Sequence, residues 1–293
     1  MSIILNCTNL LGDSLYLLRP VEEYIKDHDV CAIVTDRGLA YELFYNVFEQ
    51  TPVHVFPALM TARMLDPEAI VIDLNAGRSG ELCFKTAQAT GKQPHISEGY
   101  ASILGISLGS NIKPPTTWQR VTDKLPRTFF AISPFSRSCA RHSGERPNKT
   151  LDDFKWEYII RFLRRQGMPV KVVAGPNDRL TKCSVPLDDY FTAKNLLDLE
   201  TFLKSCALLI SVDNGLGHIA SILDTPMISL WPQVSNLQFI GPGFSPKTGI
   251  VQIGDPNIAS PSQMLMGIRH FAKELLGGLH EEEVSTIQLE EES

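Results

Sequence analysis

Short apolar runs alternate with longer segments of helical periodicity along the first part of the chain. The runs have the length of buried strands, whereas the segments between them repeat apolar residues at the spacing of an amphipathic helix. This alternation is typical of a parallel sheet whose strands are joined by crossover helices. The predicted strands are Ile3–Leu5, Cys31–Val34, Val53–Phe56 and Ile70–Ile72, and the predicted helices are Ser14–Lys26, Leu39–Phe48 and Gly80–Thr90.

The same pattern begins again near residue 128, after a stretch that contains prolines and has little periodicity. We interpret this stretch, Leu104–Pro126, as a linker. The chain is therefore predicted to be an α/β protein with two Rossmann-like domains, residues 1–126 and 127–293, that face each other across a cleft. The predicted strands of the second domain are Thr128–Ile132, Val170–Ala174, Leu208–Val212, Met227–Leu230 and Gly249–Ile253, and its predicted helices are Asp152–Arg165, Asp198–Ser205 and Leu216–Leu223.

The end of the chain divides into a helix and an acidic tail. Ser262–Leu276 carries an apolar stripe at helical spacing. This stripe should pack on the body of the protein, and in such an arrangement the helix often crosses back to the first domain. After Gly277 and Gly278 the chain is rich in glutamate and has few apolar anchors. We expect this tail to be mobile, with binding of a partner as the alternative.

Composition narrows the function classes. The chain of 293 residues is 43% hydrophobic, enough for two cores, and its formal net charge is -6. This charge gives no electrostatic footprint for a nucleic acid duplex or an anionic membrane, so nucleic acid is the less expected partner. The 6 cysteines include no Cys-x-x-Cys pair, so we expect reduced thiols. Neither a leader peptide nor an apolar run of roughly 18 residues is visible, which favours a cytoplasmic protein.

The segment Leu208–Ala220 runs from an apolar strand through a glycine-containing turn directly into a helix. The first N–H groups of a helix have no intrahelical acceptor and the helix dipole adds positive potential, so this geometry can hold a phosphate. Gly215 and Gly217 let a ligand approach the backbone, and Asp213 and His218 place two titratable groups beside it. The structural alternative is a tight strand-to-helix turn that binds nothing.

A family resemblance supports the phosphate interpretation. The residues Ser-Val-Asp-Asn-Gly-Leu-Gly-His-Ile-Ala at 211–220 resemble the Asp-Thr-Gly-x-x-His-x-Ala signature of glycosyltransferase family 9, the heptosyltransferases of lipopolysaccharide assembly. Asn214 stands where that family usually has threonine. The resemblance implies a GT-B fold and a nucleotide-diphosphate sugar as donor, with an ADP-sugar favoured. The residues that it places at the donor are Asp213, Asn214, Gly215, Leu216, Gly217 and His218.

A second motif follows the first predicted strand. Leu11-Gly12-Asp13 resembles the Leu-Gly-Asp of family 9, whose aspartate is the proposed base that removes the proton from the acceptor hydroxyl. A carboxylate at the cleft end of a strand can accept this proton as the hydroxyl attacks the anomeric carbon. The alternative is structural, because aspartate is also favoured at helix starts. Its occurrence together with the 211–220 motif favours the catalytic role for Asp13.

A third match lies at the entry to the second domain. Lys149 resembles the family lysine that binds the donor diphosphate, and Ser136 resembles the hydroxyl that bonds to phosphate. A lysine suits this role because it neutralises charge that grows on the leaving group. Arg137 and Arg141 are alternatives for the counter-charge, and Leu151–Asp152 replaces the usual Trp-Pro.

No metal site is predicted. The Asp-x-Asp of Asp27–Asp29 has the letters of a metal-dependent glycosyltransferase, but it lies in a polar turn before the second strand. The histidines show no ligand spacing with cysteines or acids, so we expect no structural zinc. The leaving group is therefore expected to be stabilised by backbone amides, the helix dipole, Ser136 and Lys149.

Two further positions bear on the donor. Asn177 or Asp178 follows a strand where the family places residues around the nucleoside, although a plain turn also suits Gly-Pro-Asn-Asp. Trp231 stands where the family commonly has glycine, so we expect an indole at the cleft edge that narrows the pocket or stacks on a sugar.

The resemblance to family 9 therefore implies an inverting, metal-independent glycosyltransferase that needs no cofactor. It would move a heptose-like sugar to a hydroxyl of a glycan or glycolipid, with a peripheral membrane contact allowed. One alternative is a GT-B enzyme with another acceptor, such as a modified DNA base or a protein; a basic cleft face would favour DNA. The other is a non-catalytic binding protein of the same fold, in which Asp13 only stabilises a helix.

Overall fold

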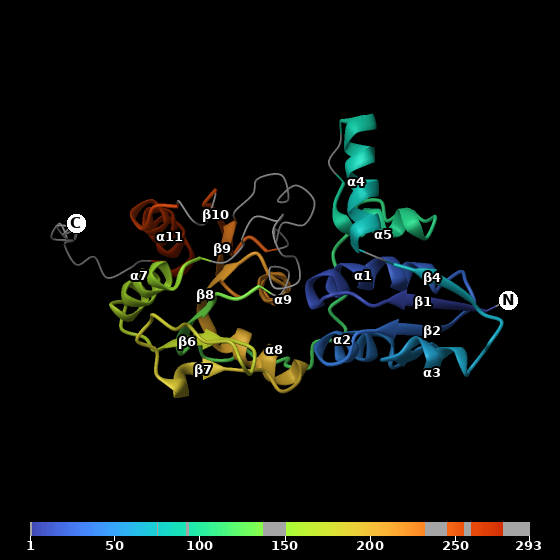
Figure 1. The fold of residues 1–293 in the computed structure, drawn as a ribbon, viewed down its shortest axis with the longest axis horizontal. Coiled ribbons are helices and arrows are strands. Elements are labelled where there is room, and N and C mark those ends of the chain that lie inside the picture. The colour runs from blue at the N-terminus through green and yellow to red at the C-terminus, as the bar shows by residue number, and fades with distance from the viewer. Residues whose placement is uncertain are drawn as a thin grey trace.

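The computed structural model forms two lobes placed side by side (Figure 1). The first lobe holds four parallel strands in the order β3-β2-β1-β4, and the second holds six in the order β10-β9-β8-β5-β6-β7. The strands of the first lobe all precede residue 126 and those of the second all follow it. The structure describes residues 2–74, 76–91, 94–136, 151–231, 245–254 and 259–277.

Four short strands build the sheet of the first lobe. In the central strand β1, the apolar residues Ile4, Leu5 and Cys7 are fully buried, as expected for a parallel strand covered on both faces. It pairs with β2 on one side and with β4 on the other. The strands are β1 (Ile3–Cys7), β2 (Val30–Thr35), β3 (His54–Phe56) and β4 (Ile70–Asp73), and the helices are α1 (Leu11–Tyr24), α2 (Leu39–Phe48), α3 (Leu59–Arg63), α4 (Ala76–Thr90) and α5 (Ile96–Ile103).

The larger sheet of the second lobe is centred on β5 and β8. Every residue of β8 is buried, which is the reason that this strand reads as one continuous apolar run. The strands are β5 (Phe129–Ser133), β6 (Val170–Val173), β7 (Tyr190–Phe191), β8 (Cys206–Val212), β9 (Met227–Trp231) and β10 (Thr248–Gln252). The helices are α7 (Asp153–Arg164), α8 (Leu196–Ser205), α9 (Gly215–Ile222) and α11 (Pro261–Leu276), with a 3-10 turn η1 at Leu187–Asp189.

The strand order fixes where a ligand can bind. In each sheet the chain starts in the middle, fills one side and then crosses to the other, so the order reverses between β1 and β4 and between β5 and β8. Crevices in parallel sheets open at the carboxyl ends of the strands beside such a reversal. The residues that follow β1, β5 and β8 therefore lie at the ligand-binding edge, which is where the sequence motifs were found.

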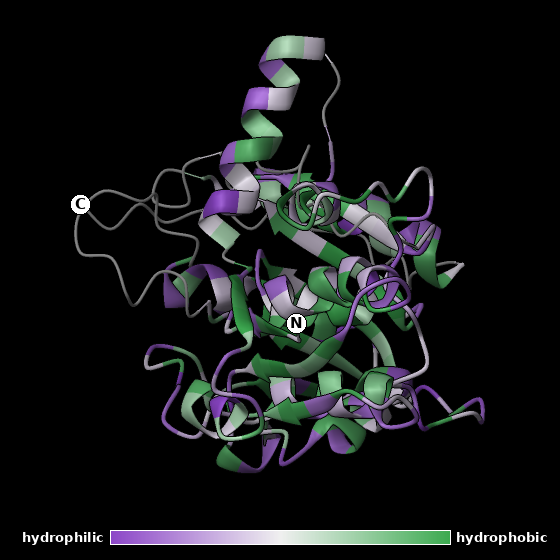
Figure 2. Ribbon diagram, turned by 90° about the vertical axis from the view of Figure 1, so that its right-hand side faces the viewer, coloured by the Kyte–Doolittle hydropathy of each residue, from purple (hydrophilic) through white to green (hydrophobic). Residues whose placement is uncertain are grey.

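The two lobes share one apolar core. Buried residues of α1 and α2 belong to the same cluster as residues of α8, β8 and α9. The strands are the most hydrophobic part of the ribbon in Figure 2. Cys7, Cys83 and Cys206 are buried in this core as free thiols. The lobes are thus held together by packed side chains around the interlobe cavity.

The predicted α/β architecture is confirmed, with four elements missed among the described residues. Helices α3 and α5, strand β7 and turn η1 were not predicted. The predicted linker, Leu104–Pro126, contains no helix or strand but is tied down, because Trp118 is fully buried within it. The backbone N–H groups of Arg120 and Val121 also donate to the buried carboxylate of Glu200, at 2.8 and 3.1 Å. This stretch is an ordered part of the core.

The expectation that the last helix crosses back to the first domain is wrong. Helix α11 packs on β8, β9, β10 and α7, all in the second lobe (Figure 1). Its apolar stripe, which includes Met264, Ile268 and Ala272, fills the core of that lobe. The reason is that β10 adds a sixth strand whose face needs covering. The acidic tail lies outside the described residues, and within them no helix is long and apolar enough to cross a membrane.

Candidate active site

A cavity of about 680 Å³ lies between the two lobes. From the first lobe it is lined by the segments that follow β1 and β2, and from the second by those that follow β5, β6, β7 and β8. Ligand pockets of drug-sized molecules have volumes of about 300–1,000 Å³, so the cavity can hold a substrate of that size. The predicted site residues that line it are Asp13, Ser136, Asp178, Asp213, Asn214, Gly215, Leu216 and His218.

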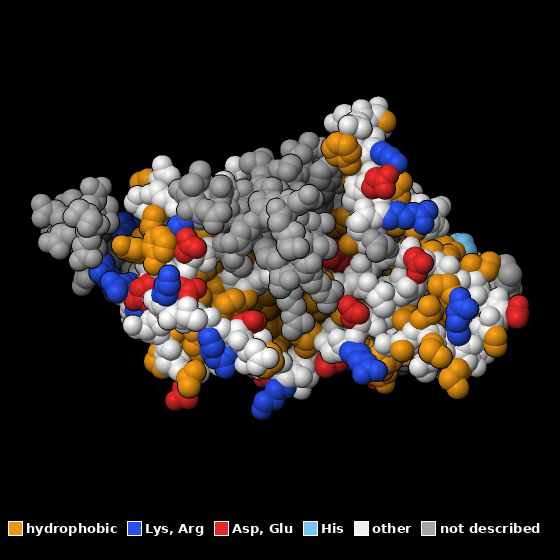
Figure 3. All heavy atoms as spheres, viewed as in Figure 1, with side chains coloured by type: hydrophobic (Ala, Val, Ile, Leu, Met, Phe, Trp, Pro, Cys, Tyr) orange, Lys and Arg blue, Asp and Glu red, His pale blue; other side chains and the backbone are white. Residues whose placement is uncertain are grey.

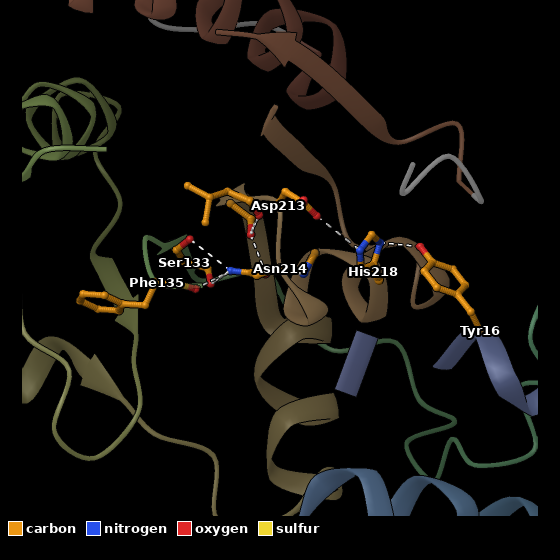
Figure 4. A network of polar contacts seen from close by, with 9 residues as sticks. Tyr16, Ser133, Phe135, Asp213, Asn214 and His218 are labelled. Carbon is orange, nitrogen blue, oxygen red and sulfur yellow. Dashed lines mark hydrogen bonds and ion pairs between the residues drawn. The ribbon is translucent and has the colours of Figure 1, made fainter. Parts of the chain in front are cut away.

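The turn after β8 is held by the side chain of Asn214. This residue is the N-cap of α9, and its Oδ1 accepts from the backbone N–H of Gly217 at 3.1 Å. Its Nδ2 donates to Ser133 Oγ at 2.8 Å and to the carbonyl oxygen of Phe135 at 3.0 Å (Figure 4). One amide thus caps the helix and ties it to the end of β5. A threonine hydroxyl could cap the helix but has a single proton to donate, which accounts for asparagine at this position.

The capping bond determines which helix-start amides face the cavity. The N–H of Gly217 is used by Asn214, and Gly217 packs against Met227 and Ser211 instead of lining the cavity. Gly215 and Leu216, the first two residues of α9, line it. Their N–H groups have no intrahelical acceptor because of their position. These two amides are therefore the ones that can meet an anion.

Removal of the Asn214 side chain should destabilise the protein. We expect Asn214→Ala to lower the free energy of unfolding by about 1–2 kcal/mol, because the cap and the two bonds to the β5 end are lost together. Asn214→Thr keeps a capping oxygen and should lose clearly less. Urea denaturation of the three proteins tests this, and equal midpoints for Asn214→Ala and the wild type would contradict it.

Asp13 lies in the first turn of α1 and lines the cavity from the first lobe. It is not the N-cap, since the helix begins at Leu11 and the N-cap is Leu10, which makes no side-chain capping bond. The carboxylate still lies where the helix dipole stabilises negative charge. The position therefore suits a base that must be ionised; a capping bond does not explain the aspartate, whereas the helix dipole remains a structural reason for it.

The starts of α1 and α9 meet at two glycines. A Cβ on Gly215 would lie 2.7 Å from the backbone nitrogen of Gly12, and a Cβ on Gly12 would lie 3.1 Å from the Cα of Gly215. Both distances are shorter than ordinary van der Waals contact, so side chains here would push the helices apart. The glycines bring the carboxylate of one lobe and the helix-start amides of the other to one cavity.

A polar contact also joins the lobes. The hydroxyl of Tyr16, on α1, lies 2.5 Å from Nδ1 of His218, on α9, and Nε2 of His218 lies 3.8 Å from Oδ1 of Asp213 (Figure 4). Tyr16 is fully buried, which raises its pKa well above 10, and the charges of Asp213 and Asp13 raise it further. The Tyr16 hydroxyl therefore keeps its proton at neutral pH.

His95 completes this cluster from α5. Its ring packs edge-on against Tyr16 with ring centroids 4.8 Å apart. Burial, and to a lesser extent the neighbouring His218, lower the pKa of His95 to about 4, so it is neutral at pH 7. Its Nδ1 accepts from the backbone N–H of Ser97 at the start of α5. His95 is thus fixed in orientation beside the Tyr16 ring.

Other predicted positions differ in where they lie. Lys149, with Arg137 and Arg141, lies outside the described residues. Ser136 is buried at the cavity wall just after β5, and Asp178 lines the cavity while accepting from the N–H of Gly175 at 3.0 Å. The Asp27–Asp29 segment follows α1 as a turn, as predicted.

The prediction for Trp231 is wrong. Its side chain is 1% exposed and does not line the cavity; it lies behind His218, with ring centroids 6.4 Å apart. The reason is that it is the last residue of β9, and its side chain points into the packed layer between that strand and α9. The indole therefore supports the histidine and does not narrow the pocket.

Sequence reasoning missed Tyr16, Arg37 and Lys194, all of which line the cavity. The spacing of Tyr16, one helical turn after Asp13, was the signal that could have placed it on the same face. Arg37 and Lys194 follow β2 and β7 in segments without a motif. Within the described residues no group of three or more His, Cys, Asp or Glu side chains is arranged to hold a metal ion.

Two facing Rossmann-like sheets with a cavity at their carboxyl ends define a protein of the GT-B class. A comparison with protein families identifies the family within this class. The profile of glycosyltransferase family 9 (heptosyltransferase) matches residues 82–261, more than half of the chain, so the chain belongs to this family. The family resemblance is thereby confirmed; the 211–220 motif lies within the matched residues, whereas the 11–13 motif lies before them and stays a prediction.

Relatives agree with this assignment. The lipopolysaccharide heptosyltransferase 3 of Escherichia coli is 24% identical over 220 residues, which cover 67% of this chain and 60% of that protein. The chain thus spans about 60% of the length of this curated relative.

Solved structures confirm the GT-B fold. The E. coli ADP-heptose lipopolysaccharide heptosyltransferase II superposes with a TM-score of 0.62 at 13% identity, over 94% of this chain and 99% of that one. The E. coli heptosyltransferase WaaC with ADP gives 0.55 at 17% identity, over 92% and 100%. The dodecameric iron-containing glycosyltransferase TibC of enterotoxigenic E. coli gives 0.59 at 13%, over 94% and 76%.

Proposed function

We propose that the protein is an inverting, metal-independent glycosyltransferase. It transfers a heptose-like sugar from a nucleotide-diphosphate donor, an ADP-sugar, to a hydroxyl of a lipopolysaccharide-type glycan. The observation that carries this proposal is that Asp13 of one lobe and the first amides of α9 of the other line the same cavity. The family and the ADP and ADP-sugar complexes of the solved relatives WaaC and TibC support the choice of donor.

The chemical step follows from the two sides of the cavity. The Asp13 carboxylate accepts the proton of the acceptor hydroxyl as its oxygen bonds to the anomeric carbon. The bond from that carbon to the diphosphate breaks, and the electron pair leaves with the diphosphate. Since attack comes from the first lobe and departure is toward the second, the anomeric configuration inverts.

The leaving diphosphate gains negative charge, which the second lobe can stabilise. The amides of Gly215 and Leu216 and the dipole of α9 supply positive potential, and the Ser136 hydroxyl supplies a further donor. Lys149 stays a prediction for the counter-charge. These groups offer the stabilisation that a metal ion supplies in other enzymes, which is the support for a metal-independent reaction.

We assign the binding of the donor's nucleoside to the segment after β6. Ala174, Gly175, Pro176 and Asp178 line the cavity, as does Leu199 of α8. One carboxylate oxygen of Asp178 already fixes the turn through Gly175, so its other oxygen is the one that we assign to a ribose hydroxyl. The small and apolar residues of this segment, with the Asp178 carboxylate, suit a nucleoside better than a second phosphate.

A donor screen followed by a transfer assay tests the proposal. An ADP-sugar should raise the melting temperature, since a ligand at about 100 times its Kd stabilises by about 2.7 kcal/mol. ADP-heptose with a truncated lipopolysaccharide should then yield ADP and a product whose anomeric configuration is opposite to that of the donor. Addition of EDTA should leave the transfer rate unchanged. Loss of activity with EDTA would contradict metal independence.

The same experiment separates the alternatives. Donor binding without turnover on any glycan would favour a non-catalytic binding protein. Transfer to DNA is tested by the salt dependence of binding, because phosphate contacts weaken steeply as salt rises. On the face drawn in Figure 3, basic and acidic side chains of the described residues are interspersed, which does not favour a duplex. Contact with a membrane stays a prediction.

A further inference from the structure

The strongest unassigned feature of the cavity is the contact between Tyr16 and His218. It joins residues that are 202 positions apart in the sequence, one from each lobe. Both side chains line the cavity, and the contact is at 2.5 Å between two buried groups. A short hydrogen bond in a buried place is stronger than one in water, so it can hold the imidazole ring in one orientation.

The surroundings determine which atom donates. Oδ1 of Asp213 lies 3.8 Å from Nε2, which is too far for a hydrogen bond but close enough for a carboxylate to favour a proton on that nitrogen electrostatically. A neutral imidazole then has a lone pair on Nδ1, and the Tyr16 hydroxyl must be the donor to it. The high pKa of Tyr16, caused first by burial, agrees with a hydroxyl that keeps its proton.

The Tyr16 ring itself cannot move freely. It contacts His95 on one side and His218 on the other, both edge-on, with centroids 4.8 and 5.0 Å apart. His95 is neutral at pH 7 and therefore does not repel a proton on His218. The hydroxyl thus has a fixed direction, supplied by α1 and supported by α5.

We propose that Tyr16 is a positioning residue that sets the tautomer and ring orientation of His218. The proton is held on Nε2, the ring nitrogen nearer Asp213, and since His218 lines the cavity this proton can be donated to an anionic leaving group. This inference rests on the proposed function for its effect on catalysis. The hydrogen-bond donor His218 of the second lobe then depends on the Tyr16 hydroxyl of the first lobe. Tyr16 lies one helical turn after the proposed base Asp13.

Tyr16→Phe removes one oxygen and keeps the ring. In long-range proton–nitrogen NMR spectra of ¹⁵N-histidine-labelled protein, the wild-type His218 should be the Nε2-protonated tautomer, and the variant should shift toward a mixture. The kcat should fall roughly tenfold or more with little change in donor KM, because misplaced groups lower the rate by up to about a hundredfold.

Tyr100→Phe is the matched control. The Tyr100 hydroxyl is buried nearby and has no hydrogen-bond partner among the described residues, so its removal should change neither the spectra nor kcat. Thermal unfolding of both variants checks that they fold.

The outcomes distinguish this inference from the proposed function. His218 signals that are identical in the wild type and Tyr16→Phe, together with equal kcat values, would overturn the positioning role while transfer activity stands. An altered tautomer in a protein without transfer activity would uphold the positioning of His218 and overturn the proposed function. The NMR measurement needs no turnover, which keeps the two questions separate.

Discussion

Replacement of Asp13 by asparagine is expected to lower kcat for sugar transfer by about a thousandfold, since a positioned base contributes roughly 10²–10⁴. Asparagine has nearly the same shape but cannot accept the acceptor proton. Donor affinity should be retained or rise slightly, because a negative charge is removed from a cavity that binds a diphosphate. Steady-state rates of ADP release and calorimetric titration with the donor measure the two quantities.

Asp36→Asn is a control for charge alone. Asp36 lines the same cavity from the same lobe but follows β2 instead of the α1 start. Its replacement should reduce kcat far less than that of Asp13. Wild-type turnover in Asp13→Asn would remove the aspartate from the role of base, and equal losses in both variants would point to a general effect of charge.

Replacement of Gly215 by alanine is expected to damage both stability and donor binding. The new Cβ would lie 2.7 Å from the nitrogen and 3.3 Å from the Cα of Gly12, and backbone atoms cannot turn aside as a side chain can. Either the lobes separate or α9 shifts away from the cavity. We expect a loss of about 1–3 kcal/mol in unfolding free energy, and weaker donor binding from the displaced amides.

Gly80→Ala is the matched control, for which we expect a gain in stability instead of a loss. Gly80 lies inside α4, and a Cβ there would meet nothing within 4 Å. Alanine should therefore stabilise the protein by about 0.5–1 kcal/mol through its higher helix propensity. Denaturant midpoints and donor titrations of the two variants check both statements. A Gly215→Ala protein with wild-type stability and donor affinity would contradict this prediction, because it would show that the two lobes can accommodate the added Cβ without loss of free energy.

Regular periodicity was the part of the fold that could be predicted. The fully apolar run of β8 indicated a central parallel strand, and the helical stripe of α2 gave its bounds, Leu39–Phe48, as observed. Elements without a long pattern were missed. Strand β7 has only two residues, and α5 begins with a histidine cap and a short apolar stretch, so neither has a period that can be recognised.

Packing partners decided the errors in placement. The apolar stripe of α11 predicted that the helix packs on a core, but not on which lobe. In the folded protein it packs on the six-stranded sheet of the second lobe. Trp231 was expected at the cleft because it stands where the family commonly has glycine, yet in the folded protein it is the buried last residue of β9 and packs near His218 of α9. Alternation along a strand gives two faces, and only the folded sheet says which is covered.

The sequence by itself determined the α/β class, the positions of Asp13, Ser136 and the 213–218 turn at strand ends, and the family, because these are properties of short segments. The tertiary structure alone decided how those segments meet. The Gly12–Gly215 approach, the bond from Tyr16 to His218 and the ties from Asn214 to the β5 end join residues about 80 to 200 positions apart. Local propensity carries no record of such partners, since the contacts exist only when two lobes have packed around a shared core.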